Sequence, residues 1–146
     1  MGGPNRRPSP GHPIRGGGRV KERAAQLVDG ADRAIVSARR ELEAGDAETA
    51  SERACVAMLR LAKACLDVDG LAPGPTQAVC LAYGNQFART GRLYSAYYRW
   101  LLDAADMRKA AGGDLNLPVD LESVALVVER AEIFRDAVIR FLERTA

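Results

Sequence analysis

The sequence predicts an all-α protein, an up-and-down bundle of about five helices. Apolar residues recur at spacings of three or four along every long segment, as on one face of a helix, and no segment alternates apolar and polar residues as a half-buried strand would. The composition is rich in alanine and arginine and only 5% aromatic, which suits helices because these side chains lose little rotamer freedom there. A chain of 146 residues is the usual size of one domain and can bury a modest core without disulfides or metals.

The first 17 residues differ from the rest of the chain. Residues 1–17 contain four prolines and several glycines with almost nothing apolar, so they are predicted to be a disordered basic tail, and the bundle is predicted to occupy 18–146. Residues 1–23 carry six Lys or Arg and one acid, whereas 24–146 carry a net charge of −3. This distribution argues against RNA binding by the whole domain, because such binders place their basic charge on a folded face.

Two helices are expected before residue 70. The first ends at Gly45, and Asp46 is a suitable N-cap for the second because its carboxylate can accept from free amides of the first turn. The apolar face of the first helix is Val20, Ala24, Leu27, Ala31, Ile35, Ala38 and Leu42, and that of the second is Ala47, Ala50, Ala54, Met58, Leu61, Cys65 and Val68. The short connection EAGD predicts that they pair antiparallel.

Three further helices follow the turn DGLAPGPT. A short third helix begins near Thr76 and carries Val79, Tyr83 and Phe87. The fourth contains Leu93, Tyr97, Leu101, Ala104 and Met107 and breaks at Gly112–Gly113, because glycine costs about 1 kcal/mol in a helix interior. The last follows or includes Pro118 and buries Val124, Val127, Ala131, Phe134, Val138 and Phe141.

Several functional classes are excluded by absent patterns. The three cysteines, Cys55, Cys65 and Cys80, are odd in number and lack C-x-x-C spacing, so buried reduced thiols are expected. The N-terminus lacks the apolar region of a secretory signal, and no run of about 18 apolar residues occurs, so a cytoplasmic protein without membrane contact is expected. Asp103 and Asp106 have no His or Cys near them, so no metal or other cofactor is predicted.

A family resemblance rests on the order of five features. EAGDAETASERACVAMLRLAKACL, GLAPGPTQAV and FARTGRL occur in succession and precede an arginine near the end of the next helix and a long closing helix. This order, over about 120 residues, resembles that of HEPN domains. The resemblance implies a helical bundle that forms homodimers and is often encoded beside a minimal nucleotidyltransferase as a toxin–antitoxin pair. Active family members are metal-independent ribonucleases that use an arginine followed by a histidine at the dimer interface.

Arg108 matches the arginine of the family's active site, but the histidine does not carry over. KAAGGDL follows Arg108, and the only histidine of the chain is His12. Cleavage through the 2′-hydroxyl needs a group of near-neutral pKa to move protons, and Asp114, near the histidine position, would be ionised and repel phosphate. The protein is therefore expected not to be an enzyme, with an atypical ribonuclease built around Arg108 as the alternative.

Arg108 could instead bind a phosphate or nucleotide together with Arg53 and Lys109. The competing interpretation is a cation stabilised by the dipole at the C-terminal end of its helix, worth a few tenths of a kcal/mol. Arg53 and Arg60 lie seven residues apart and share a helix face, which suits either a ligand pocket or an ion pair with a nearby glutamate.

Tyr94, Tyr97, Tyr98 and Trp100 form an aromatic cluster that is expected to contribute to the core and a dimer contact. Flanking arginines make this the one place where basic and aromatic residues interleave, so it is also a possible nucleic-acid surface. The candidate residues of that surface are Arg89, Arg92, Arg99, Tyr97 and Tyr98.

The leading hypothesis is a dimeric, non-catalytic HEPN-like module that binds RNA, a nucleotide or a partner, with a nucleotidyltransferase as the partner. A third hypothesis is a structural adaptor whose basic tail contacts nucleic acid, which predicts salt-sensitive binding that is lost without residues 1–23.

Overall fold

The computed structural model describes residues 13–111 and 119–145, with side chains from residue 22 onward. Within these ranges the ordered elements are all helical, and the prediction of an all-α bundle with five helices is confirmed. The helices are α1 (Pro13–Glu43), α2 (Ala47–Val68), α3 (Thr76–Tyr83), α4 (Ala96–Ala111) and α5 (Leu121–Thr145), and a π-helical turn, η1 (Gly84–Ala88), follows α3 directly.

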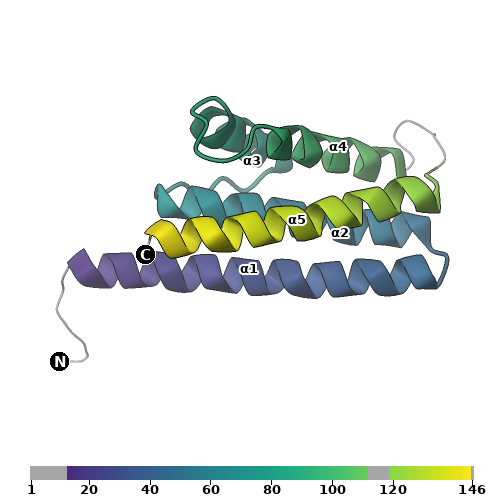
Figure 1. Cartoon of the computed structure of the whole chain (residues 1–146), viewed down its shortest axis with the longest axis horizontal. Coiled ribbons are helices and arrows are strands. Elements are labelled where there is room, and N and C mark those ends of the chain that lie inside the picture. Colours follow the sequence, from purple (N-terminus) through teal and green to yellow (C-terminus); the bar gives the residue numbers. More distant parts are fainter. Residues whose placement is uncertain (1–12, 112–118, 146) are drawn as a thin grey trace.

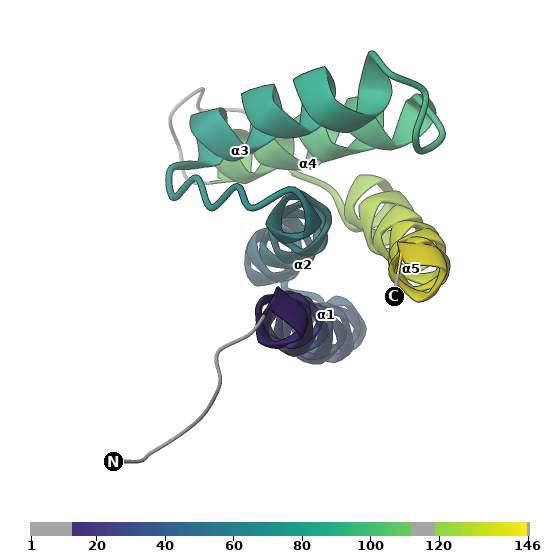
Figure 2. The same ribbon diagram turned by 90° about the vertical axis from the view of Figure 1, so that its left-hand side faces the viewer.

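Helix α2 is the centre of the bundle. It contacts α1, α3, α4 and α5, and Figure 1 shows it between α1 on one side and α3 and α4 on the other. Residues on nearly all sides of its C-terminal half are buried, as expected of a helix surrounded by others. In Figure 2, α1, α2 and α5 are seen nearly end-on while α3 lies across them, so the bundle departs from a simple up-and-down arrangement at α3.

The antiparallel pairing of α1 and α2 is confirmed. Arg60 donates from Nη1 to the carbonyl of Gly30 (2.9 Å), and Arg23 lies 3.5 Å from Asp67, so residues further along α2 meet residues nearer the start of α1. Asp46 caps α2 as predicted, accepting from the Thr49 amide at 3.0 Å. Helix α1 begins at Pro13, earlier than the predicted boundary at residue 18, while residues 1–12 lie outside the described part.

The α3 segment changes its hydrogen-bonding pattern at Gly84. Residue 89 donates its amide to the Gly84 carbonyl (2.9 Å), five residues back, which is the π-helical pattern. A Cβ on Gly84 would lie 2.8 Å from Cζ of Tyr98, so glycine lets the start of α4 approach this turn closely. Gly91, with φ of 71°, then reverses the chain toward α4.

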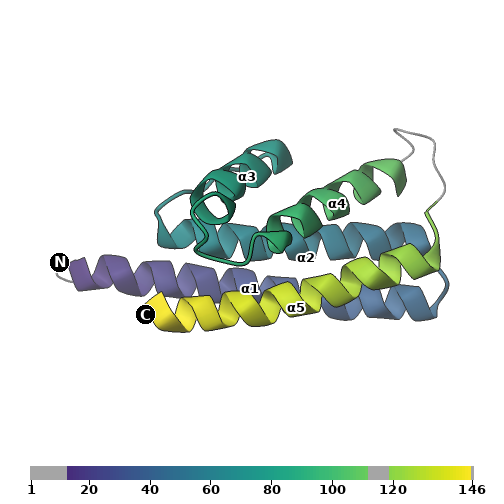
Figure 3. The ribbon, with the colours of Figure 1, turned by 45° about the horizontal axis from the view of Figure 1, so that its top comes forward.

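Helix α4 begins at Ala96, so Leu93, expected on its apolar face, lies in the preceding connection, although it is buried. The predicted break at Gly112–Gly113, together with Asp114 and Pro118, lies outside the described residues. Helix α5 runs antiparallel to α1 across the bundle (Figure 3) and is tied to it by ion pairs of Arg135 with Asp32 and of Arg39 with Glu132.

The core contains an aromatic cluster at the junction of α3, η1, α4 and α5. The ring of Phe134 lies 5.6 Å from that of Tyr83 and 5.2 Å from that of Tyr97, measured between centroids. Phe87 in turn stacks on Tyr83 (5.3 Å) and meets the edge of Phe141 (5.3 Å). The cluster therefore holds the α3–α4 connection against α5.

The three cysteines are buried free thiols, as predicted. Burial raises the pKa of each, most of all that of Cys65, so they remain protonated and weakly nucleophilic near neutral pH.

No helix in the described ranges is long and apolar enough to cross a lipid bilayer.

Candidate functional site

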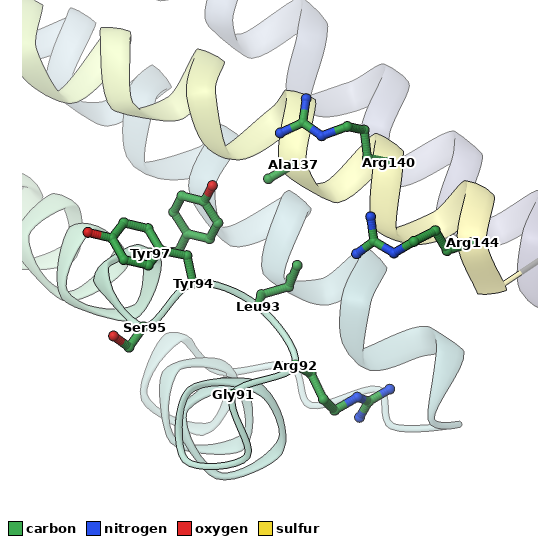
Figure 4. Close-up of a pocket in the computed structure, with 9 residues that line it drawn as sticks. All are labelled: Gly91, Arg92, Leu93, Tyr94, Ser95, Tyr97, Ala137, Arg140 and Arg144. Carbon is green, nitrogen blue, oxygen red and sulfur yellow. The ribbon is translucent and has the colours of Figure 1, made fainter.

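A groove of about 410 Å³ lies between the α3–α4 connection and the C-terminal half of α5. We call it the arginine–tyrosine groove (Figure 4). Its lining residues are Gly91, Arg92, Leu93, Tyr94, Ser95, Tyr97, Ala137, Arg140 and Arg144. The volume falls within the range of about 300–1,000 Å³ typical of ligand pockets, so the groove can accept a group the size of a nucleotide.

Two of its three arginines come from α5. Arg140 and Arg144 are four residues apart and therefore project from the same side of the helix, as Figure 4 shows. Both are exposed, and neither forms an ion pair with another described residue. Their guanidinium groups are therefore available to an anion.

Arg92, at the opposite wall, is fixed in place. It forms a bidentate ion pair with Asp69 at 2.7 and 3.1 Å, and this hydrogen bonding raises the pKa of Arg92. Its Cζ also lies 4.2 Å from the centre of the Phe87 ring, a cation–π contact. Asp69 neutralises part of the charge of Arg92, so Arg140 and Arg144 supply most of the positive potential in the groove.

The two tyrosines differ in exposure. Tyr97 is buried and packs on Phe134, whereas Tyr94 is 65% exposed and meets the edge of Tyr97 at 5.4 Å. Tyr94 is thus an exposed aromatic ring supported by a buried one. Such a ring can stack on a flat, apolar surface such as a nucleobase.

The structure brings together only part of the predicted nucleic-acid surface. Arg92 and Tyr97 line the groove, but Arg89 and Arg99 are exposed outside its lining. Tyr98 packs against Gly84 and does not line the groove. The sequence prediction did not include Arg140 and Arg144, although their spacing on one face of the last helix was visible in the sequence.

Arg108 occupies the junction of α2 and α4. Its Nη2 lies 4.0 Å from Oε2 of Glu52, and both side chains are about half exposed, so this pair contributes little to stability. Arg53 and Lys109 are exposed and do not line either of two cavities that Arg108 lines. These two cavities therefore do not bring Arg53 and Lys109 together with Arg108, and the phosphate site of these three residues stays a prediction.

Among the described residues, neither Arg53 nor Arg60 forms the predicted ion pair with a glutamate. Arg60 donates to the Gly30 carbonyl instead. Arg60 and Arg108 both line a second cavity, of about 250 Å³, which we call the α2–α3 cavity. Its lining residues are Val56, Leu59, Arg60, Lys63, Gly74, Thr76, Val79 and Arg108.

The surroundings of Arg108 bear on whether it could act in proton transfer. The described ranges contain no histidine, because His12 lies outside them, and Asp114 lies outside them as well. Cys55 is close to Arg108, but burial raises the pKa of its thiol and the nearby guanidinium only partly opposes this. The described residues also contain no group of three His, Cys, Asp or Glu side chains that could hold a metal ion.

Comparison of the sequence with protein families and with curated proteins gives no relative for this chain. The chain matches no protein-family model and no curated protein. The resemblance to HEPN domains therefore rests on the order of sequence motifs alone.

Proposed function

We propose that this protein is a non-catalytic module that binds single-stranded RNA or a nucleotide in the arginine–tyrosine groove. The observation that supports this most strongly is the composition of the groove: three arginines and two tyrosines line it, and no carboxylate does. Proteins that bind single strands combine positive grooves that follow the phosphates with aromatic rings that stack on the bases.

Each kind of side chain has a defined role in the proposal. Arg140 and Arg144 pair with phosphate oxygens, because a guanidinium donates two parallel hydrogen bonds to such a group. Tyr94 stacks on an unpaired base, a contact worth about 1–3 kcal/mol per base. Arg92 is held by Asp69 and shapes the wall of the groove.

The test is RNA binding by the purified full chain, measured by fluorescence anisotropy with a labelled single-stranded oligonucleotide. Replacing Arg140 and Arg144 together by Ala is expected to weaken binding by about tenfold or more. Loss of two phosphate contacts should also reduce the slope of log affinity against log salt by about 1.4. Tyr94→Ala should weaken binding, whereas Tyr94→Phe, which keeps the ring, should not.

The matched control is the double replacement of Arg89 and Arg99 by Ala. These arginines are exposed outside the groove, so the variant loses the same charge elsewhere and should keep nearly normal affinity. Equal losses in both double variants would contradict the groove as the site and indicate nonspecific charge attraction. Removing residues 1–12 in parallel leaves α1 (Pro13–Glu43) whole and measures the contribution of the segment that precedes it.

The rival function, an atypical ribonuclease around Arg108, is tested on the same samples. Intact RNA after long incubation is the expected result. RNA cleavage that disappears in Arg108→Ala would contradict the non-catalytic assignment and identify Arg108 as a catalytic residue. The Arg108 variant also controls for a contaminating nuclease, because contamination would persist in it.

A further part of the proposal is that the module is a HEPN-like homodimer that works with a nucleotidyltransferase as a toxin–antitoxin pair. It is supported by the order of sequence motifs and by exposed apolar side chains on α1 and α5, namely Val36, Leu126 and Ile133. Analytical ultracentrifugation is expected to give twice the mass of the chain. A monomer that does not co-purify with a nucleotidyltransferase encoded beside it would contradict this part and leave the RNA-binding part standing.

A further inference from the structure

The α2–α3 cavity has a cationic lining and lies apart from the groove. Arg60 and Lys63 come from α2 and Arg108 from α4, while Gly74 and Thr76 belong to the α2–α3 connection and the start of α3. No carboxylate lines it, and no residue is shared with the groove. Three basic residues from two helices therefore line one cavity of about 250 Å³.

The charges of these cations are poorly compensated. Among the described residues, neither Arg60 nor Lys63 forms an ion pair, and Arg108 has only the 4.0 Å contact with Glu52. Arg60 is held in position by the Gly30 carbonyl, an uncharged partner. An anion in the cavity would offset the positive charge of its lining.

The start of α3 adds to the positive potential. Its N-cap is Pro75, which provides no side-chain hydrogen bond to the first turn. Amides at the beginning of the helix are therefore left without a side-chain cap, and the helix dipole points its positive end toward this region. Thr76, which lines the cavity, also supplies a hydroxyl that can donate to an oxyanion.

We propose that the α2–α3 cavity binds a phosphate group. The cavity is smaller than the range of about 300–1,000 Å³ typical of pockets for larger ligands, so a phosphate group fits better than a whole nucleotide. The group is either free inorganic phosphate or the terminal phosphate of a nucleotide whose remaining part projects outward. Bound there, it bridges α2, α3 and the end of α4, and it stabilises their packing.

The test is thermal unfolding of the full chain with added inorganic phosphate, compared with chloride at equal ionic strength. Phosphate at about ten times its Kd should raise the Tm by about 4 °C. Lys63→Gln and Arg108→Gln, each of which removes one charge from the lining, should abolish or sharply reduce that rise. Lys109→Gln is the matched control, because Lys109 neighbours Arg108 but does not line the cavity, and it should respond as the unchanged protein does.

Each result has a defined consequence. No phosphate-specific rise in the unchanged protein, or an undiminished rise in both cavity variants, would overturn the proposal. Loss of the rise in the Arg140/Arg144 double variant alone would overturn it too, because phosphate would then bind in the groove. Adenosine monophosphate serves as the second ligand and is tested in the Arg140/Arg144 double variant, so that the groove does not contribute: a larger rise than with phosphate indicates a terminal phosphate, and an equal or smaller rise indicates free phosphate. The proposal is independent of RNA binding, so either can fail while the other stands.

Discussion

Phe134→Ala is expected to lower the free energy of unfolding by about 3–5 kcal/mol. Phe134 is completely buried and contacts the rings of Tyr83 and Tyr97, so its removal leaves a cavity among large, rigid side chains that cannot easily close around it. Tyr97 also supports Tyr94, so the same substitution should weaken RNA binding beyond any loss due to unfolding. Urea denaturation followed by circular dichroism measures the first effect.

An exposed leucine on α3 provides the control. Leu81 is also a large apolar residue, but it is 64% exposed, so Leu81→Ala should change the free energy of unfolding by no more than about 0.5 kcal/mol. Comparable losses of unfolding free energy in the two variants would show that Phe134 is not the centre of the core aromatic cluster, which consists of Tyr83, Phe87, Tyr97, Phe134 and Phe141. RNA binding by Phe134→Ala should be measured at a urea concentration well below the midpoint of its unfolding, where the protein is folded. This measurement separates the effect on the groove from the effect on stability.

The parts of the fold that depend on local spacing could be predicted from the sequence. The Asp46 cap, the start of α3 at Thr76 and the apolar faces of α2 and α5 depend on residues within a few positions of one another. The π-helical turn at Gly84 was not predicted. The close approach of Tyr98 to Gly84 comes from another helix, so local spacing in the sequence does not show it. The orientation of α3 across the bundle likewise depends on contacts distant in sequence.

The same distinction explains the outcome for the candidate site. Aromatic and basic residues between 89 and 100 indicated one wall of the arginine–tyrosine groove, since they are close together in sequence. Arg140 and Arg144 form the other wall, and only the packing of α5 beside the α3–α4 connection brings them there. The Arg108 prediction came from motif order, which does not show that Arg60 and Lys63, rather than Arg53 and Lys109, share its cavity.

The second large effect is expected from Ala31→Leu. Ala24, Ala31 and Ala38 recur every seven residues on α1 and are 0–1% exposed, and buried alanines such as Ala54 and Ala57 lie on α2. Small side chains let helices approach closely, and the distance between helix axes depends on the side chains at the contact. A leucine at position 31 has no space, so the free energy of unfolding should fall by about 1–3 kcal/mol or more.

Ala25→Leu separates this steric effect from the chemistry of the substitution. Ala25 lies on the same helix but is exposed, and leucine is nearly as good a helix former as alanine, so stability should change little. Similar effects at both positions would contradict close packing of α1 as the cause. Loss of stability at Ala31 alone would mean that the short alanine side chains set the position of α1 against its neighbours. Because Arg60 reaches from α2 to the Gly30 carbonyl, displacement of α1 by Ala31→Leu should also reduce the phosphate-dependent rise in Tm.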